Sequence, residues 1–268
     1  MKKLMIAMAA MTAGVAMADV TSANIVGYAN NSLSNGYKAV SIPFKAVGTV
    51  VDGKRGIYLS QIVVSGADKI TTSENTVQLQ ALDPEGRAGI TYTYHKGEGP
   101  SSRYYKVDGW YQGTKLVGTG VDDQFYPEGT GLWVSGKATL DFLSSGEVEL
   151  DTIQTDLVSG YRLIGNPYPT TIKLSNFVPT GVEKITTSEN TVQIQSLDTE
   201  GRAGITYTYH KGEGPSSRYY KVDGWYQGTK LVGSGVPDVD IPAGVSLWVS
   251  SANPEIDIQV VTPFEDAE

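Results

Sequence analysis

The feature that most constrains the fold is a repeat within the chain. The 24 residues HKGEGPSSRYYKVDGWYQGTKLVG occupy 95–118 and recur unchanged at 210–233. The close match extends over 69–118 and 184–233, where three of the 50 positions differ. The copies lie 115 residues apart. This is the size of one domain, and it is much longer than the units of roughly 20–50 residues that build solenoids. The sequence therefore predicts two domains in series.

Outside this segment the two copies have diverged. Weaker matches continue outward and pair 33–44 with 157–168, 57–63 with 172–178, and 126–135 with 241–250. The offset between the copies falls from 124 to 115 because the first copy carries an insertion of nine residues around 45–56. We predict that the first β module spans 19–150 and that the second spans 151–268.

Residues 1–18 predict a cleaved signal peptide. Lys2 and Lys3 precede an apolar run over 4–15, and the small-residue cleavage motif Ala16-Met17-Ala18 follows. The apolar run is too short to anchor the chain in a bilayer, and no later stretch is long enough for a transmembrane segment. We expect export to the extracellular space, the cell surface or the periplasm.

Charge and cysteine content exclude several classes of partner. Without Lys2 and Lys3 the chain has 19 basic and 29 acidic residues, a net charge of −10. Nucleic acids and anionic lipids require a basic surface, so neither is an expected partner. The chain has no cysteine, which excludes disulfides and thiolate metal sites.

Short alternating segments predict an all-β fold. In ITYTYH (90–95) apolar and aromatic residues alternate with Thr and His, and TVQLQAL (76–82) alternates in the same way. The pair Asp108-Gly109 predicts a two-residue hairpin turn between strands at 103–107 and 110–112. Only IKLSNFV (172–178) indicates a single helical turn. Many short strands at this spacing predict an antiparallel β-sandwich or barrel in each domain.

The residues provide no evidence of catalysis. The two histidines, His95 and His210, are one position present in both copies. No GxSxG motif marks an activated serine, and one histidine per copy is too few for a transition-metal site. Acidic pairs such as Asp83 and Glu85 are typical of turns. We predict a non-enzyme without cofactor or metal.

Aromatic residues near each Asp-Gly pair are the predicted ligand-binding residues: Arg103, Tyr105, Trp110 and Tyr111, with the equivalents Arg218, Tyr220, Trp225 and Tyr226. Exposed aromatic rings suit sugars or a protein partner, because they combine flat apolar area with a polar edge. The alternative is that the tryptophans cover the apolar edge of a hairpin. The other tryptophans, Trp133 and Trp248, lie in apolar runs and are predicted to be core residues.

The order of motifs resembles an uncharacterised β module that is repeated in secreted and surface proteins of Gram-negative bacteria. The second copy carries the resemblance with GYRLIGNPYP (160–169), IKLSNF (172–177) and the closing strand IPAGVSLWV (241–249). The first copy has weaker forms, GYKAVSIPF (36–44) and YPEGTGLWV (126–134). The resemblance implies an extracytoplasmic β domain and carries over no catalytic or binding residue.

These observations lead to two functional hypotheses. The first is a secreted or surface-exposed structural or assembly protein of the bacterial cell envelope, which contacts copies of itself or the surrounding matrix. The alternative is a carbohydrate-binding protein that uses its two aromatic turns bivalently on a surface glycan. The unchanged segment is explained either by recent recombination or by selection on a surface that is used twice.

Overall fold

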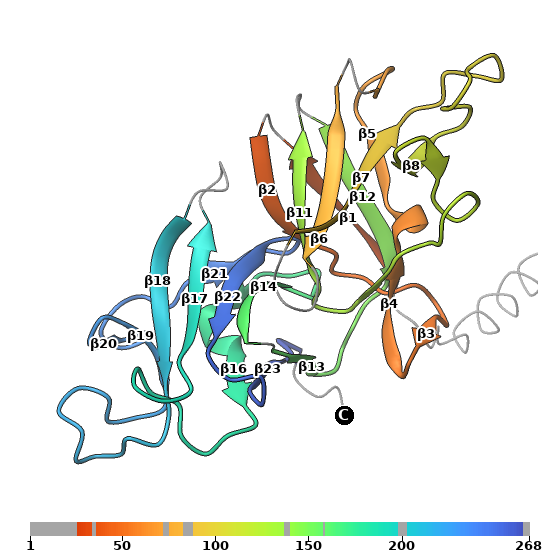
Figure 1. Ribbon diagram of the computed structural model, residues 1–268. Helices are drawn as coiled ribbons and strands as arrows, with labels where there is room; N and C mark the ends of the chain where they lie inside the picture. The colour runs from red at the N-terminus through yellow and green to blue at the C-terminus, as the bar shows by residue number, and fades with distance from the viewer. Residues whose placement is uncertain are drawn as a thin grey trace, which may run out of the picture.

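The computed structural model describes residues 26–33, 36–71, 75–82, 88–136, 140–157, 159–197 and 203–264. The predicted signal peptide lies outside these residues. The fold is all-β, as predicted, and its sheets are antiparallel (Figure 1). Within the described part of the chain no helix is long and apolar enough to cross a membrane.

The first repeat forms a six-stranded sheet and two smaller sheets. The large sheet contains, in spatial order, β2 (Gly36–Ser41), β11 (Gly131–Gly136), β6 (Val77–Leu82), β7 (Ala88–His95), β8 (Gly109–Gln112) and β9 (Lys115–Leu116). One smaller sheet contains β1 (Val26–Leu33), β12 (Leu140–Glu147) and β5 (Val63–Ser65). The other contains β10 (Phe125–Pro127), β4 (Lys54–Tyr58) and β3 (Val50–Val51). One 3-10 turn, η1 (Leu59–Gln61), precedes β5. The insertion of the first repeat forms the β3–β4 hairpin.

The second repeat has the same arrangement without that hairpin. Its six-stranded sheet contains β14 (Gly160–Gly165), β22 (Ser246–Ser251), β17 (Val192–Leu197), β18 (Ala203–His210), β19 (Gly224–Gln227) and β20 (Lys230–Leu231). The smaller sheets are β13 (Ile153–Asp156), β23 (Asp257–Val260) and β16 (Phe177–Thr180), and the pair β15 (Ile172–Lys173) and β21 (Asp240–Ile241). The predicted helical turn is η2 (Leu174–Asn176).

A separate buried cluster forms the core of each repeat. In the first, Trp110 packs edge-on against Tyr94 and Phe142, with ring centroids 5.2 Å and 6.3 Å away. Phe142 lies on β12, so the sheet β1-β12-β5 covers the inner face of the six-stranded sheet. In the second repeat Trp225 packs on Tyr209 in the same way, 5.1 Å between centroids. Each repeat is thus a sheet-on-sheet packing.

The predicted hairpin at Asp108-Gly109 is wrong. Residues 96–108 form a loop, and β8 begins at Gly109 and pairs with β7 and β9. The Asp108 carboxylate accepts a hydrogen bond from the Gly97 backbone N–H at 2.6 Å and so closes the base of this loop. A short carboxylate side chain that bonds the backbone competes with strand pairing.

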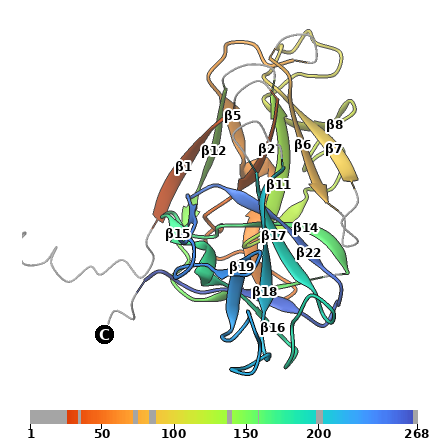
Figure 2. The same ribbon diagram turned by 90° about the vertical axis from the view of Figure 1, so that its left-hand side faces the viewer.

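The two six-stranded sheets meet at the ends of their edge strands (Figures 1 and 2). The Ser41 N–H donates to the Gly244 carbonyl at 2.9 Å, and the Gly165 N–H donates to the Gly129 carbonyl at 2.8 Å. The sequence alignment makes Ser41 equivalent to Gly165, and Gly129 equivalent to Gly244. Each contact is therefore made twice with the roles of the repeats exchanged, as in an isologous dimer. We call this contact the junction; an approximate twofold axis passes through it.

Candidate functional site

Most of the predicted aromatic site is buried. Trp110 and Trp225 are 1% and 2% exposed, and Tyr111 and Tyr226 are each 2% exposed. Trp110 donates its indole N–H to the Ile62 carbonyl at 2.8 Å, and Trp225 donates to the Phe177 carbonyl. These four rings offer no face to a ligand. Their strands turn them towards the protein, so the burial of these four side chains gives no support to the prediction that they bind a ligand.

The remaining predicted residues do not form a shared surface either. Tyr105 lies flat on His95, with ring centroids 3.6 Å apart, and Tyr220 lies on His210 at 3.5 Å. Arg103 and its equivalent Arg218 are exposed, and each guanidinium lies 5.0 Å from the ring centroid of the next tyrosine along the chain. The aromatic side chains therefore order the two loops from within.

Each six-stranded sheet instead presents a polar face away from its core, which we call the outer face. On the first sheet, register pairs Gln78 with Ser135 and Thr93, and Gln80 with Trp133 and Thr91. On the second, Gln193 faces Ser250 and Thr208, and Gln195 faces Trp248 and Thr206. All these side chains are at least partly exposed, and none is charged. Cross-strand bonds such as Gln80 Nε2 to Thr91 Oγ1, 3.2 Å, hold the amides in place.

Four aromatic rings link the two outer faces across the junction. Tyr37 on β2 stacks on Trp133, with centroids 5.8 Å apart and an interplanar angle of 19°. Tyr161 on β14 stacks on Trp248 at 5.8 Å and 23°. The tryptophans lie 6.4 Å apart across the twofold axis. The tyrosines are 54% and 53% exposed. We call Tyr37, Trp133, Trp248 and Tyr161 the junction row; it is our candidate functional site.

The sequence contains a signal for this row that our core assignment missed. In Leu132-Trp133-Val134 the outer two side chains are buried, so alternation sends the tryptophan to the opposite face. The same holds for Leu247-Trp248-Val249. The prediction that both tryptophans are core residues is therefore wrong. The pairing of each with a tyrosine on an edge strand requires the strand order, which the sequence alone does not supply.

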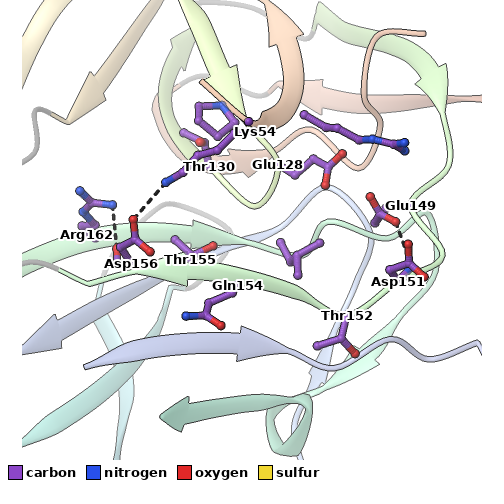
Figure 3. A pocket seen from close by; sticks show the side chains of 14 residues that line it. Lys54, Glu128, Thr130, Glu149, Asp151, Thr152, Gln154, Thr155, Asp156 and Arg162 are labelled. Carbon is purple, nitrogen blue, oxygen red and sulfur yellow. Dashed lines mark hydrogen bonds and ion pairs between the residues drawn. The ribbon is translucent and has the colours of Figure 1, made fainter. Parts of the chain in front are cut away.

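A cleft of about 440 Å³ lies beside the junction, between the β3–β4 hairpin and β13 (Figure 3). Lys54 and Asp156 form an ion pair across it at 3.0 Å, and Arg162 donates to the Asp156 carbonyl at 2.9 Å. Deeper in, the buried Lys45 ammonium donates to Glu149 at 2.8 Å. Glu128 lies beside this pair, with its Oε1 3.9 Å from the Lys45 ammonium.

The two carboxyl groups have opposite protonation preferences. Burial, together with the neighbouring Glu149 carboxylate, raises the pKa of Glu128 to about 8. Burial also opposes ionisation of Glu149, but hydrogen bonds from Lys45 and from the Asp151 backbone outweigh it and lower the pKa of Glu149. An acid beside a carboxylate is the pair that glycoside hydrolysis uses.

This pair nevertheless has a structural role. One oxygen of Glu149 accepts the backbone N–H groups of Leu150 and Asp151, both at 2.9 Å, and the other accepts Lys45. The Tyr168 hydroxyl lies 2.9 Å from the Asp151 carbonyl and 2.7 Å from the Val260 carbonyl, and so holds this segment against the second repeat. Three hydrogen bonds therefore hold the Glu149 carboxylate to the segment that connects the repeats.

In the part of the chain that the structure describes, the histidines and the acidic residues form no metal site. Among the described residues no group of three His, Asp or Glu side chains is placed to hold an ion. His210 Nδ1 lies 2.8 Å from Glu213, whereas neither ring nitrogen of His95 has a hydrogen-bond partner in the described part of the chain. Burial lowers the pKa of His95 and keeps the ring neutral.

Comparison of the chain with protein-family models, with curated proteins and with solved structures finds no match. The junction row supplies apolar ring surface, and the outer faces supply amide and hydroxyl groups that both donate and accept hydrogen bonds. This combination suits a ligand that is uncharged, hydroxylated and partly apolar.

Proposed function

We propose that this chain is a non-enzymatic binding protein that holds a neutral polysaccharide on its outer faces and junction row. The observation that carries the proposal is the composition of these faces. Sugar rings present an apolar C–H face, which stacks on aromatic rings, and hydroxyl groups, which bond with Gln, Thr and Ser side chains.

The absence of charge on the outer-face residues favours a neutral ligand over an acidic one. The chain has 29 acidic and 21 basic residues, so charged side chains are abundant elsewhere. An acidic polymer would require clustered Lys or Arg on the binding face, and a basic partner would require Asp or Glu. Gln78, Gln80, Thr91 and Thr93 supply neither. A neutral polymer of the bacterial surface or its surroundings also fits the predicted export.

The test is electrophoresis of the folded protein in native gels that contain a neutral polysaccharide: β-glucan, xylan, galactomannan, starch or dextran. We expect at least one to retard the wild-type protein. Replacing both tryptophans (Trp133→Ala with Trp248→Ala) should weaken retardation by about tenfold or more, since each lost aromatic contact costs roughly 0.5–1.5 kcal/mol beyond its area.

The matched control is Tyr104→Ala with Tyr219→Ala, which removes two tyrosines, 46% and 48% exposed, in the loops that follow β7 and β18. Retardation of this variant should equal that of the wild type. A wild-type protein that migrates freely through all five gels overturns the proposal. So does a wild-type dimer that the tryptophan variant converts to monomer, because the row would then be an interface between copies of the chain.

A further inference from the structure

The approximate twofold axis limits how a polysaccharide can lie on the two outer faces. The junction contacts are reciprocal, with Val40 bridged to Val245 and Ile164 bridged to Thr130. The axis relates the polar side chains on the outer face of the first sheet to those on the outer face of the second, so both sets have equivalent surroundings. The residues of these rows from β6, β7, β17 and β18 lie in the repeated segment and are the same in both copies: Gln78, Gln80, Thr91 and Thr93, and Gln193, Gln195, Thr206 and Thr208.

A polysaccharide chain has a direction, because its reducing end differs from its non-reducing end. A single chain that crossed the junction would approach the axis on one face and leave it on the other. It would therefore present opposite directions to two sets of identical side chains. Hydrogen bonds that fit the sugar hydroxyls on the first face would not fit them on the second. One continuous ligand cannot satisfy both faces equally.

Each face is large enough to act alone. On the second sheet one row of exposed or partly exposed side chains runs across four strands, from Tyr161 through Ser250 and Gln193 to Thr208. With strands roughly 4.8 Å apart, a row of this kind spans about 14 Å. Its stacking partner, the Tyr161–Trp248 pair, belongs to the same sheet. Neither face requires a residue of the other to make a complete site.

We infer that the chain has two equal and independent polysaccharide sites, one on each outer face, and that it cross-links separate polysaccharide chains. This inference rests on the proposed function and adds the number and arrangement of its sites. Two sites on one chain join two polymer segments, and cross-links of this kind build a network. The closely matched segments 69–118 and 184–233, which contain these Gln and Thr residues, then serve a surface that is used twice.

The first test is calorimetric titration with the hexasaccharide of the polysaccharide that retards the protein most. We expect two sites per chain with one dissociation constant. A first-face variant (Gln78→Ala with Thr93→Ala) and a second-face variant (Gln193→Ala with Thr208→Ala) should each keep one site with an unchanged constant. Combining all four substitutions should abolish binding.

The second test is the viscosity of a dilute solution of the long polysaccharide. The wild-type protein should raise it, and each one-face variant should bind without raising it. One site per chain that both one-face variants lose would overturn the inference, because a single ligand would then span the junction. A viscosity that the wild type leaves unchanged would overturn it as well. Both results leave the proposed function intact, whereas free migration in all five gels defeats the proposed function itself.

Discussion

At the residue scale, the connection between the repeats depends on a buried ammonium and two carboxyl groups. Lys45 and Glu149 are 3% and 5% exposed and form a direct ion pair. Breaking such a buried pair by removal of one partner is strongly destabilising, because the other charge remains buried and unpaired. Glu128 destabilises the folded state when it is ionised, because its charge would be a second negative charge buried beside Glu149.

Replacing Glu128 by glutamine should stabilise the fold in alkaline solution. A carboxyl group whose pKa rises on folding holds its proton more tightly in the folded state. Its ionisation therefore removes stability as pH rises from its ordinary value of 4.5 to about 8. Glutamine keeps a hydrogen-bond donor and has no charge. We expect Glu128→Gln to raise the Tm by several degrees at about pH 8.5 and to change it little near pH 4.

Glu149→Gln provides the opposite control. Folding lowers the pKa of Glu149, so its negative charge stabilises the folded state above the unfolded pKa. This stabilisation is lost as the pH falls through the folded pKa. This variant should lower the Tm at about pH 8.5. Thermal melts of both variants across the pH range measure these effects. A Tm change of the same sign for both variants in alkaline solution would contradict the assignment of opposite roles.

At the element scale, the junction depends on side chains too small to collide. A Cβ atom at Gly165 would lie 2.0 Å from Cβ of Ser41, and one at Gly131 would lie 2.6 Å from Cβ of Leu163. Ser41 and Gly165 are aligned positions of the two repeats, and they face each other across the junction. Two serines here would overlap, so one repeat has serine and the other has glycine.

Gly165→Ser should therefore destabilise the protein by about 1–3 kcal/mol, the usual cost of overpacking a close contact. Ser41→Gly in the same chain should recover much of the loss, because it reopens the space. Ser41→Gly alone should cost about 1 kcal/mol, since it removes the 2.6 Å hydrogen bond to the Asn166 carbonyl. Urea unfolding of the three variants gives the coupling energy. Additive effects of the two substitutions would refute the direct contact.

The sequence predicts local structure well where alternation is strong. In β6 and β7 Val77, Leu79, Tyr92 and Tyr94 are buried, as the period of two requires. The alternation fails at the two ends of β7, where Ile90 is 50% exposed and His95 is fully buried. The errors arise where a side-chain contact decides the backbone. Tyr104 and Tyr105 alternate like strand residues, yet they lie in a loop that Asp108 closes. The candidate site was missed because stacking of Tyr37 on Trp133 depends on which strands are neighbours.

At the scale of the whole molecule, the junction determines which surfaces remain free for a second copy. The reciprocal contacts that could form a homodimer are made within one chain, between β2 and β11 of one repeat and β14 and β22 of the other. A self-complementary surface that is already covered cannot pair again. The expectation of a structural or assembly role stays a prediction, and its test at this scale is the molecular mass.

Light scattering of the purified protein over a wide concentration range, without polysaccharide, should give the mass of one chain throughout. Gly165→Ser provides a useful comparison, because a loosened junction frees the self-complementary edges and should produce dimers at high concentration. Ordered oligomers of the wild type would support self-assembly as the function and would count against the covered junction.

The pairing of the first and last strands of each repeat determines how the protein responds to mechanical force. Val26 pairs with Glu147 where β1 begins and β12 ends, and Ile153 pairs with Val260 in the same way on β13 and β23. Tension along the backbone therefore separates β1 from β12, and β13 from β23, starting at one end, so that their hydrogen bonds break one after another. A load that enters through the two outer faces reaches broad sheets, where many hydrogen bonds share it. If the chain cross-links polysaccharides as we infer, it should resist force that is applied through its ligands and unfold when it is pulled by its ends.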